Sequence, residues 1–170
     1  MKQIMKIVSL IVLCVVMAFA ALHINQPNAS TFEGRERILQ EYSDDIMWKI
    51  HSETMIDGDI VCAIYSNQYD GLAWFHQNRD GKYNWQGTTW TAKGTPINKL
   101  IIKNTEVYEI YWLNRENVER FEVNFTFDDG TTETMQFDMS KRNIAWYQHP
   151  SSSFKFETIF YDTNGNEIEF

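Results

Sequence analysis

The sequence predicts a mostly β fold, α+β in the loose sense, and three observations lead to it. The chain contains 6 Trp, 8 Tyr and 11 Phe, and aromatic residues favour half-buried positions on strands. Apolar and polar residues alternate over Val118–Asp128, as in an antiparallel strand with one buried face. Short apolar runs recur between Gly-containing turns. We therefore expect an N-terminal signal or anchor helix, one short helix and about ten mainly antiparallel strands, in a hairpin-rich half and a small β-sandwich-like half.

Residues 1–24 are predicted to be a signal peptide or membrane anchor. Lys2 and Lys6 precede the uncharged, almost wholly apolar run Ile7 to Leu22. This run has the length of a long signal-peptide core and is slightly short of the ~20 residues that span a bilayer. The small-x-small site at residues 18–20 predicts cleavage before Ala21. We expect an exported protein, either membrane-anchored with its domain outside or secreted after cleavage.

A polar tether and a short helix are expected next. Residues 25–30 are polar and contain a proline, which is typical of a linker. Ser30 and Glu33 have the spacing of a capping box. Leu39, Tyr42 and Ile46 follow at helical spacing. The pattern predicts a helix over residues 31–44.

The rest of a first part, residues 31–92, is predicted to be built from strands and hairpins. Trp48 and Ile50 alternate with polar residues, and Asp57-Gly58 is a turn signal before the apolar run Asp59–Ser66. Gly71–Gln77 and Tyr83–Trp90 flank a second turn signal, Asn78 to Gly81. Residues 91–98 contain Gly94 and Pro96 and are predicted to form a loop between the two halves.

The second part, residues 99–170, is predicted to be an antiparallel sandwich-like unit. In the strand Val118–Asp128 the inward residues are expected to be Phe121, Val123, Phe125 and Phe127. The returning strand, Thr131–Asp138, should direct Met135 and Phe137 inward. The remaining strands are predicted at Lys99–Asn104, Val107–Leu113, Asn143–Gln148, Phe154–Asp162 and Glu167–Phe170.

The net charge of the chain limits its partners. The formal charge is −8 at pH 7, and removal of the leader would take away Lys2 and Lys6 but no acid. A field of this sign repels phosphate backbones and anionic lipid headgroups. We therefore expect no nucleic-acid partner.

No catalytic or metal-binding motif is evident, and no cofactor is implied. Cys62 and a histidine could supply a thiol nucleophile and a base, but Cys62 lies in an apolar run, so packing is the preferred interpretation. The histidines share no ligand spacing. The segment Asp162–Glu167 faintly resembles a calcium loop, but its glycine comes too early. A hairpin turn is the preferred interpretation there, and no pair of acids is singled out.

Three tryptophans are the candidate ligand-binding residues. Trp74, Trp85 and Trp90 lie on the two predicted strands of one hairpin. Alternation would bring Trp74 and Trp85 close across the pair. An exposed row of rings could stack on sugars or hold an apolar peptide. The alternative, which the usual burial of large aromatics favours, is a cross-strand aromatic core.

The layout resembles small exported or membrane-tethered proteins of unknown function from low-GC Gram-positive bacteria. The residues that carry the resemblance are the lysine-flanked N-terminal segment, DGDIVCAIYSN (Asp57–Asn67), the hairpin Asp80–Trp85 and the final FYDTNGNEIEF (Phe160–Phe170). The resemblance implies an extracytoplasmic location and a β-rich fold. It implies no activity and no functional residue.

Three functions are consistent with these features. The preferred hypothesis is a non-enzymatic binding or accessory module at the cell envelope, whose partner is an envelope protein or polysaccharide. The second is an envelope-directed hydrolase that uses surface carboxylates or Cys62. The third is a structural subunit of a membrane complex.

Overall fold

The computed structural model describes residues 28–43, 45–95, 97–103, 106–113, 118–139, 144–150 and 153–168. The predicted leader, residues 1–24, lies outside the described residues, as do residues 25–27 of the predicted tether. Among the described helices, none combines the length and the apolar character that a membrane crossing requires.

The described chain forms one helix and three antiparallel sheets, which confirms the prediction of a mostly β fold. Helix α2 comprises Phe32–Glu41. Sheet A is a meander of β1 (Lys49–Ile56), β2 (Asp59–Tyr65), β3 (Tyr69–Gln77) and β4 (Tyr83–Ala92). Sheet B has the order β5 (Ile97–Lys103), β6 (Val107–Leu113), β9 (Ile144–Gln148). Sheet C has the order β11 (Glu167–Ile168), β10 (Phe154–Asp162), β7 (Val118–Phe127), β8 (Thr132–Asp138).

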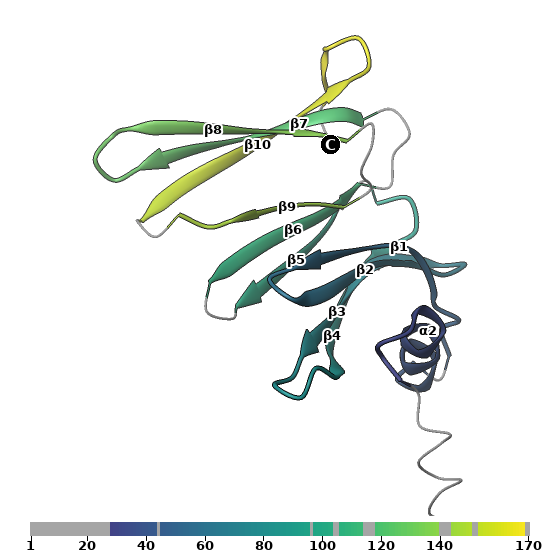
Figure 1. Ribbon diagram of the computed structural model, residues 1–170. Helices are drawn as coiled ribbons and strands as arrows, with labels where there is room; N and C mark the ends of the chain where they lie inside the picture. Colours follow the sequence, from purple (N-terminus) through teal and green to yellow (C-terminus); the bar gives the residue numbers. More distant parts are fainter. Residues whose placement is uncertain are drawn as a thin grey trace, which may run out of the picture.

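These elements stack in four layers, in the order α2, sheet A, sheet B and sheet C (Figure 1). Leu39 of α2 packs with Cys62 and Phe75 on the outer face of sheet A. The inner face of sheet A packs on sheet B through residues such as Leu72 and Ile110. Sheets A and B are therefore covered on both faces, and this explains the nearly continuous apolar run of β2.

The third layer boundary, between sheets B and C, is mainly aromatic. Tyr111 and Tyr147 of sheet B pack against Phe121 and Phe125 of sheet C. Phe121, Val123 and Phe125 are buried, as their alternation predicted. Phe127, Met135 and Phe137 are partly buried and pack against the same cluster.

The boundaries of α2 differ from the prediction at both ends. Thr31, rather than Ser30, is the N-cap, and its Oγ1 accepts a hydrogen bond of 3.0 Å from the Gly34 amide. The Ser30 amide donates instead to Asn28 Oδ1, so a local turn occupies the residue that the capping-box pattern indicated. The helix ends at Glu41, three residues early, and Ile46 packs on sheet A from the connection that follows.

The segment predicted as a loop over residues 91–98 is shorter in the structure. Strand β4 continues to Ala92 and β5 begins at Ile97. A tight turn around Gly94, which has a φ of 86°, redirects the chain. This turn transfers the chain from sheet A to sheet B.

Candidate functional site

The structure places the three candidate tryptophans on two different faces of sheet A. Trp74 packs toward sheet B, whereas Trp85 packs on the face that carries α2. The register of the hairpin causes this separation, because Trp85 pairs with Phe75, and Trp74, the neighbour of Phe75 on β3, faces the opposite side. The expected closeness of Trp74 and Trp85 across the hairpin is therefore wrong.

A β-bulge brings Trp85 and Trp90 to one face, because Trp74 pairs with Gly87 while the next residue, Phe75, pairs with Trp85. Residues five apart on a regular strand lie on opposite faces, because the side-chain period is two. With Gln86 left over in the bulge, Trp85 lies opposite Phe75 and Trp90 lies opposite Gly71. Phe75 belongs to the core beneath α2, so both tryptophans face the helix side.

A groove of about 340 Å³ lies between these tryptophans and the end of α2. We call it the aromatic groove. Its lining residues are uncharged: Leu39, Tyr42, Ser43, Trp48, Trp85, Gly87, Thr88 and Trp90. Tyr42 is 65% exposed and Trp90 is 52% exposed, whereas Trp48 is 1% exposed. The groove therefore has accessible aromatic walls and a buried indole beneath them.

Internal contacts hold the rings of the aromatic groove in place. Tyr42 stacks on Trp85, with ring centroids 4.2 Å apart and an interplanar angle of 22°. The indole N–H of Trp85 donates to Thr88 Oγ1 and that of Trp48 to Ser43 Oγ, each at 3.1 Å. Since the ring orientations are fixed before any ligand arrives, binding would cost little side-chain entropy.

Sequence reasoning did not identify Tyr42, Ser43 and Trp48 as groove residues. Tyr42 was assigned to the apolar face of the helix and Trp48 to a strand. The structure places Tyr42 at the C-cap of α2 and Trp48 just before β1. Their proximity to β4 depends on how α2 lies on sheet A, and no local pattern in the sequence encodes this.

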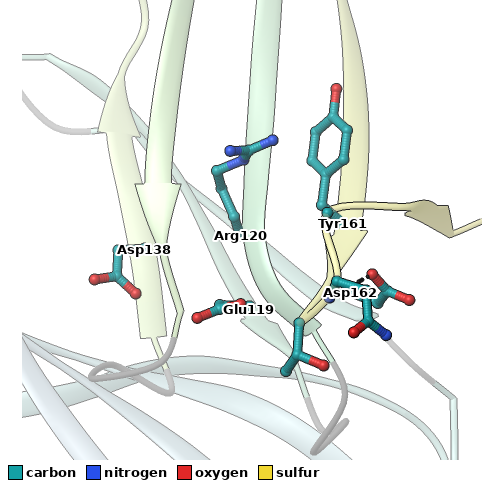
Figure 2. A pocket seen from close by; sticks show the side chains of 8 residues that line it. Glu119, Arg120, Asp138, Tyr161 and Asp162 are labelled. Carbon is teal, nitrogen blue, oxygen red and sulfur yellow. Dashed lines mark hydrogen bonds between the residues drawn. The ribbon is translucent and has the colours of Figure 1, made fainter.

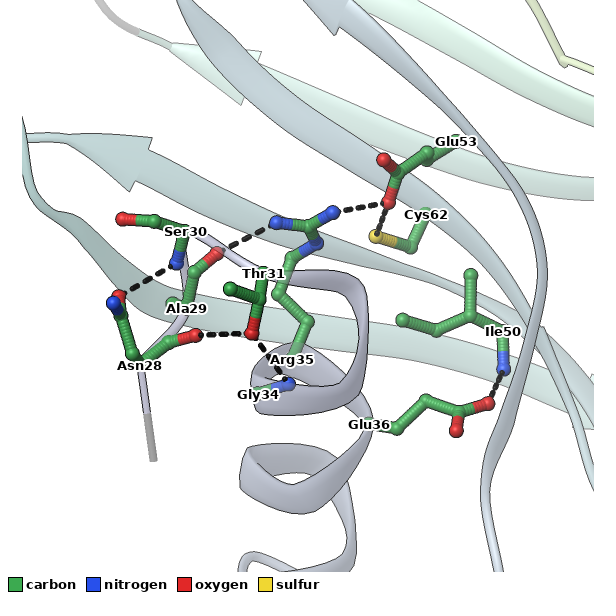
Figure 3. Close-up of polar contacts among 10 residues, drawn as sticks. All are labelled: Asn28, Ala29, Ser30, Thr31, Gly34, Arg35, Glu36, Ile50, Glu53 and Cys62. Atoms are coloured by element: carbon green, nitrogen blue, oxygen red, sulfur yellow. Dashed lines mark hydrogen bonds and ion pairs between the residues drawn. The ribbon is translucent and has the colours of Figure 1, made fainter. Parts of the chain in front are cut away.

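Cys62 lies in a polar contact network beside α2 and is not among the residues that line the aromatic groove (Figure 3). Its side chain is 0% exposed, and its Sγ lies 4.0 Å from Glu53 Oε2. Burial, together with the charge of Glu53, raises the pKa of the Cys62 thiol to about 12. A thiol of this kind is protonated at neutral pH, which argues against a nucleophilic role.

Arg35 occupies the centre of this network (Figure 3). It is 3% exposed, and its guanidinium donates to the Ala29 carbonyl at 2.7 Å and to Glu53 Oε2 at 2.5 Å. Glu36 binds the Ile50 amide through its carboxylate at 2.9 Å. These contacts join the N-terminal turn, α2 and β1, so the network fixes the helix that forms one wall of the groove.

A buried carboxylate, that of Asp59, explains the position of Trp74. Asp59 accepts hydrogen bonds from the Trp74 indole at 2.7 Å and from the Gln77 amide at 3.0 Å, and it lies 2.9 Å from His76 Nδ1. Trp74 is thus tied to the start of β2 and packs between sheets A and B. It has a structural role in this arrangement.

The most concentrated set of ionisable groups lies between sheets B and C. Glu109 is 1% exposed and contacts Lys99, the Tyr111 hydroxyl and His149 Nε2, the last at 2.7 Å. Burial opposes ionisation of Glu109, but these hydrogen bonds outweigh it and hold the pKa of the carboxyl below its ordinary value. Burial also raises the pKa of Tyr111, with a further contribution from the Glu109 hydrogen bond. We call this set the Glu109 cluster.

A larger, open hollow of about 480 Å³ lies at one end of sheet C (Figure 2). Glu119, Arg120, Asp138, Tyr161 and Asp162 line it, and the Arg120 guanidinium lies 4.3 Å from the centre of the Tyr161 ring. Its acids come from three strands.

The calcium-loop interpretation of the turn after β10 is not supported by its geometry. The Asp162 carboxylate accepts bonds from the amides of Asn164 and Asn166, at 2.9 and 2.8 Å, and hydrogen bonding from Asn166 holds its pKa below the ordinary value. Gly165 has a φ of 80°, as a tight turn requires. In the part of the chain that the structure describes, no set of three or more His, Cys, Asp or Glu is placed to bind a metal ion.

Comparison with known proteins gives no relative: no family model, no curated protein and no solved structure matches this chain.

Proposed function

We propose that this chain is an extracytoplasmic binding module of the cell envelope, and that its aromatic groove binds an uncharged segment of an envelope polysaccharide. The observation that carries the proposal is the groove itself. Tyr42 and Trp90 are exposed, Trp85 is half-buried, and all three belong to an uncharged lining. Rings of this kind stack on the apolar faces of sugars.

The chemistry of the lining favours a neutral sugar over other ligands. None of the lining side chains is charged, so the groove offers no partner for an ionic group. The acidic net charge of the whole chain disfavours anionic polymers. The side-chain hydroxyls of Ser43 and Thr88 belong to the lining, and each can still donate to or accept from a sugar hydroxyl.

The location belongs to the same proposal. Residues 1–24 would carry the domain across the membrane and then either anchor it or be removed before Ala21. Fractionation of cells, followed by sequencing of the mature N-terminus, tests this. Recovery of the intact chain in the soluble cytosolic fraction would contradict it.

Ligand binding is tested by titrating the full chain with soluble uncharged oligosaccharides, including glucans and N-acetylglucosamine oligomers. Tryptophan fluorescence and calorimetry are the two readouts. We expect Trp90→Ala and Tyr42→Ala each to weaken binding about tenfold, since a stacked ring contributes about 0.5–1.5 kcal/mol beyond its buried area.

Tyr65→Ala is the matched control, because Tyr65 is an exposed aromatic residue at the end of β2 and outside the groove lining. It should leave the affinity unchanged. An affinity that survives both groove substitutions would refute the proposal. So would selective binding of an apolar peptide in place of every sugar.

A further inference from the structure

Strand β4 is an edge strand of sheet A: it pairs with β3 on one side, and its other side is not paired with any described strand (Figure 1). Its backbone pairs with β3 from Tyr83 to Ala92, with only Gln86 left unpaired in the bulge. Within the described ranges, no strand pairs with its other side. An edge strand presents a row of backbone N–H and C=O groups that can form hydrogen bonds with another strand.

β4 carries no charged residue and no proline over its ten residues, YNWQGTTWTA. Border strands are usually protected by charges that prevent pairing. The other edge strands of seven or more residues follow this rule, whereas β9 is uncharged but has only five residues. β1 carries Lys49 and Glu53, and β8 carries Glu133 and Asp138. In a chain with a charge of −8, β4 is therefore a border along which two copies can approach without local repulsion.

The neighbouring layer does not occupy this border. The Thr89 hydroxyl donates to the Lys99 carbonyl, and the Thr91 hydroxyl donates to Asn98 Oδ1. Both side chains lie opposite buried residues of β3 and face sheet B. The contacts with β5 thus come from the face of β4, and no described strand pairs with the outer side of its backbone.

We infer that two copies of this chain pair antiparallel through β4, about a two-fold axis at Thr88, to form one continuous sheet. The sequence of β4 is self-complementary in this register. With Thr88 on the axis, residue 89 faces residue 87 of the second copy. If Gln86 stays unpaired, as it is against β3, Trp90 then faces Trp85 of the second copy.

The register keeps like faces together. Trp85, Thr88 and Trp90 all lie on the helix side of sheet A. The pairing therefore places the exposed Trp90 of each copy beside the half-buried Trp85 of the other copy, so that two such tryptophan pairs form, one on each side of the axis. Cross-strand aromatic pairs stabilise antiparallel strands, and a two-fold contact uses the same patch on both copies. This inference does not depend on what the aromatic groove binds.

Analytical ultracentrifugation of the full chain in mild detergent, over a range of concentrations, tests the association. We expect a monomer–dimer equilibrium. The double variant Asn84→Lys/Gln86→Lys should weaken the dimer at least tenfold, because it adds like charges along the border. The control Thr132→Lys/Thr134→Lys adds the same charge to β8 and should leave the dimer unchanged. Circular dichroism confirms that both variants are folded.

A disulfide cross-link tests the register independently. In a Cys14→Ser background, Thr88→Cys should give a disulfide-linked dimer on mild oxidation, whereas Thr132→Cys should not. Cys62 does not interfere, since it is fully buried. A single monomeric species at every concentration would overturn the inference. So would an association that the lysines on β4 leave intact, or a Thr88→Cys protein that fails to cross-link.

Discussion

Gly71 on β3 lies directly opposite Trp90, and its missing side chain makes room for that residue. A Cβ at this position would lie 2.2 Å from the Thr89 carbonyl oxygen and 2.9 Å from the Cβ of Trp90. Both atoms belong to β4, which cannot shift without disturbing its pairing with β3. A glycine is therefore required for the close approach of these two strands.

Gly71→Ala is expected to reduce the free energy of unfolding by about 1–3 kcal/mol, the usual effect of overpacking. It should also displace Trp90 and so lower the affinity of the aromatic groove for its ligand. Urea unfolding measures the first effect. Gly87→Ala is the control, since a Cβ there would meet no atom within 4 Å. Its effect should stay within about 0.5 kcal/mol, and equal losses in the two variants would contradict this explanation.

The positions of individual residues were predictable only where local alternation decides them. The inward face of β7 followed from the alternation of Phe121, Val123 and Phe125, and the structure confirms it. The faces of Trp74, Trp85 and Trp90 did not follow, because the register at the turn sets Trp85 opposite Phe75, and one unpaired residue then reverses the alternation before Trp90. Nothing in the sequence of β4 identifies Gln86 as that residue.

At the scale of the secondary-structure elements, the Arg35 side chain ties α2 to its surroundings. Arg35 joins the N-terminal turn and β1 from a nearly inaccessible position. Arg37, two residues later, makes an exposed pair with Glu41 at 3.2 Å. The two arginines thus offer a buried and a solvated ion pair on the same helix.

Arg35→Leu is expected to lower the free energy of unfolding by about 3 kcal/mol, the lower end for a broken buried pair, because Glu53 is partly hydrated. Arg37→Leu should cost only about 0.3–0.5 kcal/mol. Thermal or denaturant unfolding distinguishes them. Similar losses for the two substitutions would show that Arg35 does not fix the helix.

The strands themselves were largely predictable as elements. β6 and β10 have the predicted boundaries, and most other strands differ by one or two residues. The turns at Asp57-Gly58 and Asn78–Gly81 were marked by residues that tolerate a positive φ. The packing of α2 on sheet A was not predictable, and the groove residues that it contributes were missed for that reason.

At the scale of the whole molecule, the Glu109 cluster joins the middle sheet to the outer one. Lys99 comes from β5, Glu109 from β6, and His149 follows directly after β9. The Lys99 ammonium also lies 5.0 Å from the centre of the Phe156 ring of sheet C. The Glu109 carboxylate is only 1% exposed, and its charge is tolerated there because its partners form hydrogen bonds and ion pairs with it.

Glu109→Gln should destabilise the fold by about 3 kcal/mol at pH 7, since it leaves two basic groups without their partner. The pKa of Glu109 is lower in the folded chain than the ordinary 4.5. Its ionisation therefore stabilises the fold above that pH, and this contribution is lost as the pH falls through the folded value.

The difference in unfolding free energy between wild type and Glu109→Gln should accordingly shrink on acidification. Urea unfolding at a series of pH values measures this difference. Glu133→Gln on the exposed face of β8 is the control and should show no such trend. A difference that is constant with pH would contradict the role of the ionised carboxylate.

The path of the chain between sheets B and C has a consequence for how the molecule assembles. After β7 and β8 in sheet C, the chain returns to sheet B as β9 and then goes back to sheet C as β10. Glu109 thus meets His149 across 40 residues, and closing such long loops slows folding. Sheet A can form early, because its strands are joined by adjacent hairpins. Its inner apolar face then stays exposed until sheet B has formed and packs against it. The partly folded chain is most prone to aggregation during that interval, and a chaperone that binds exposed apolar surface would act at this stage.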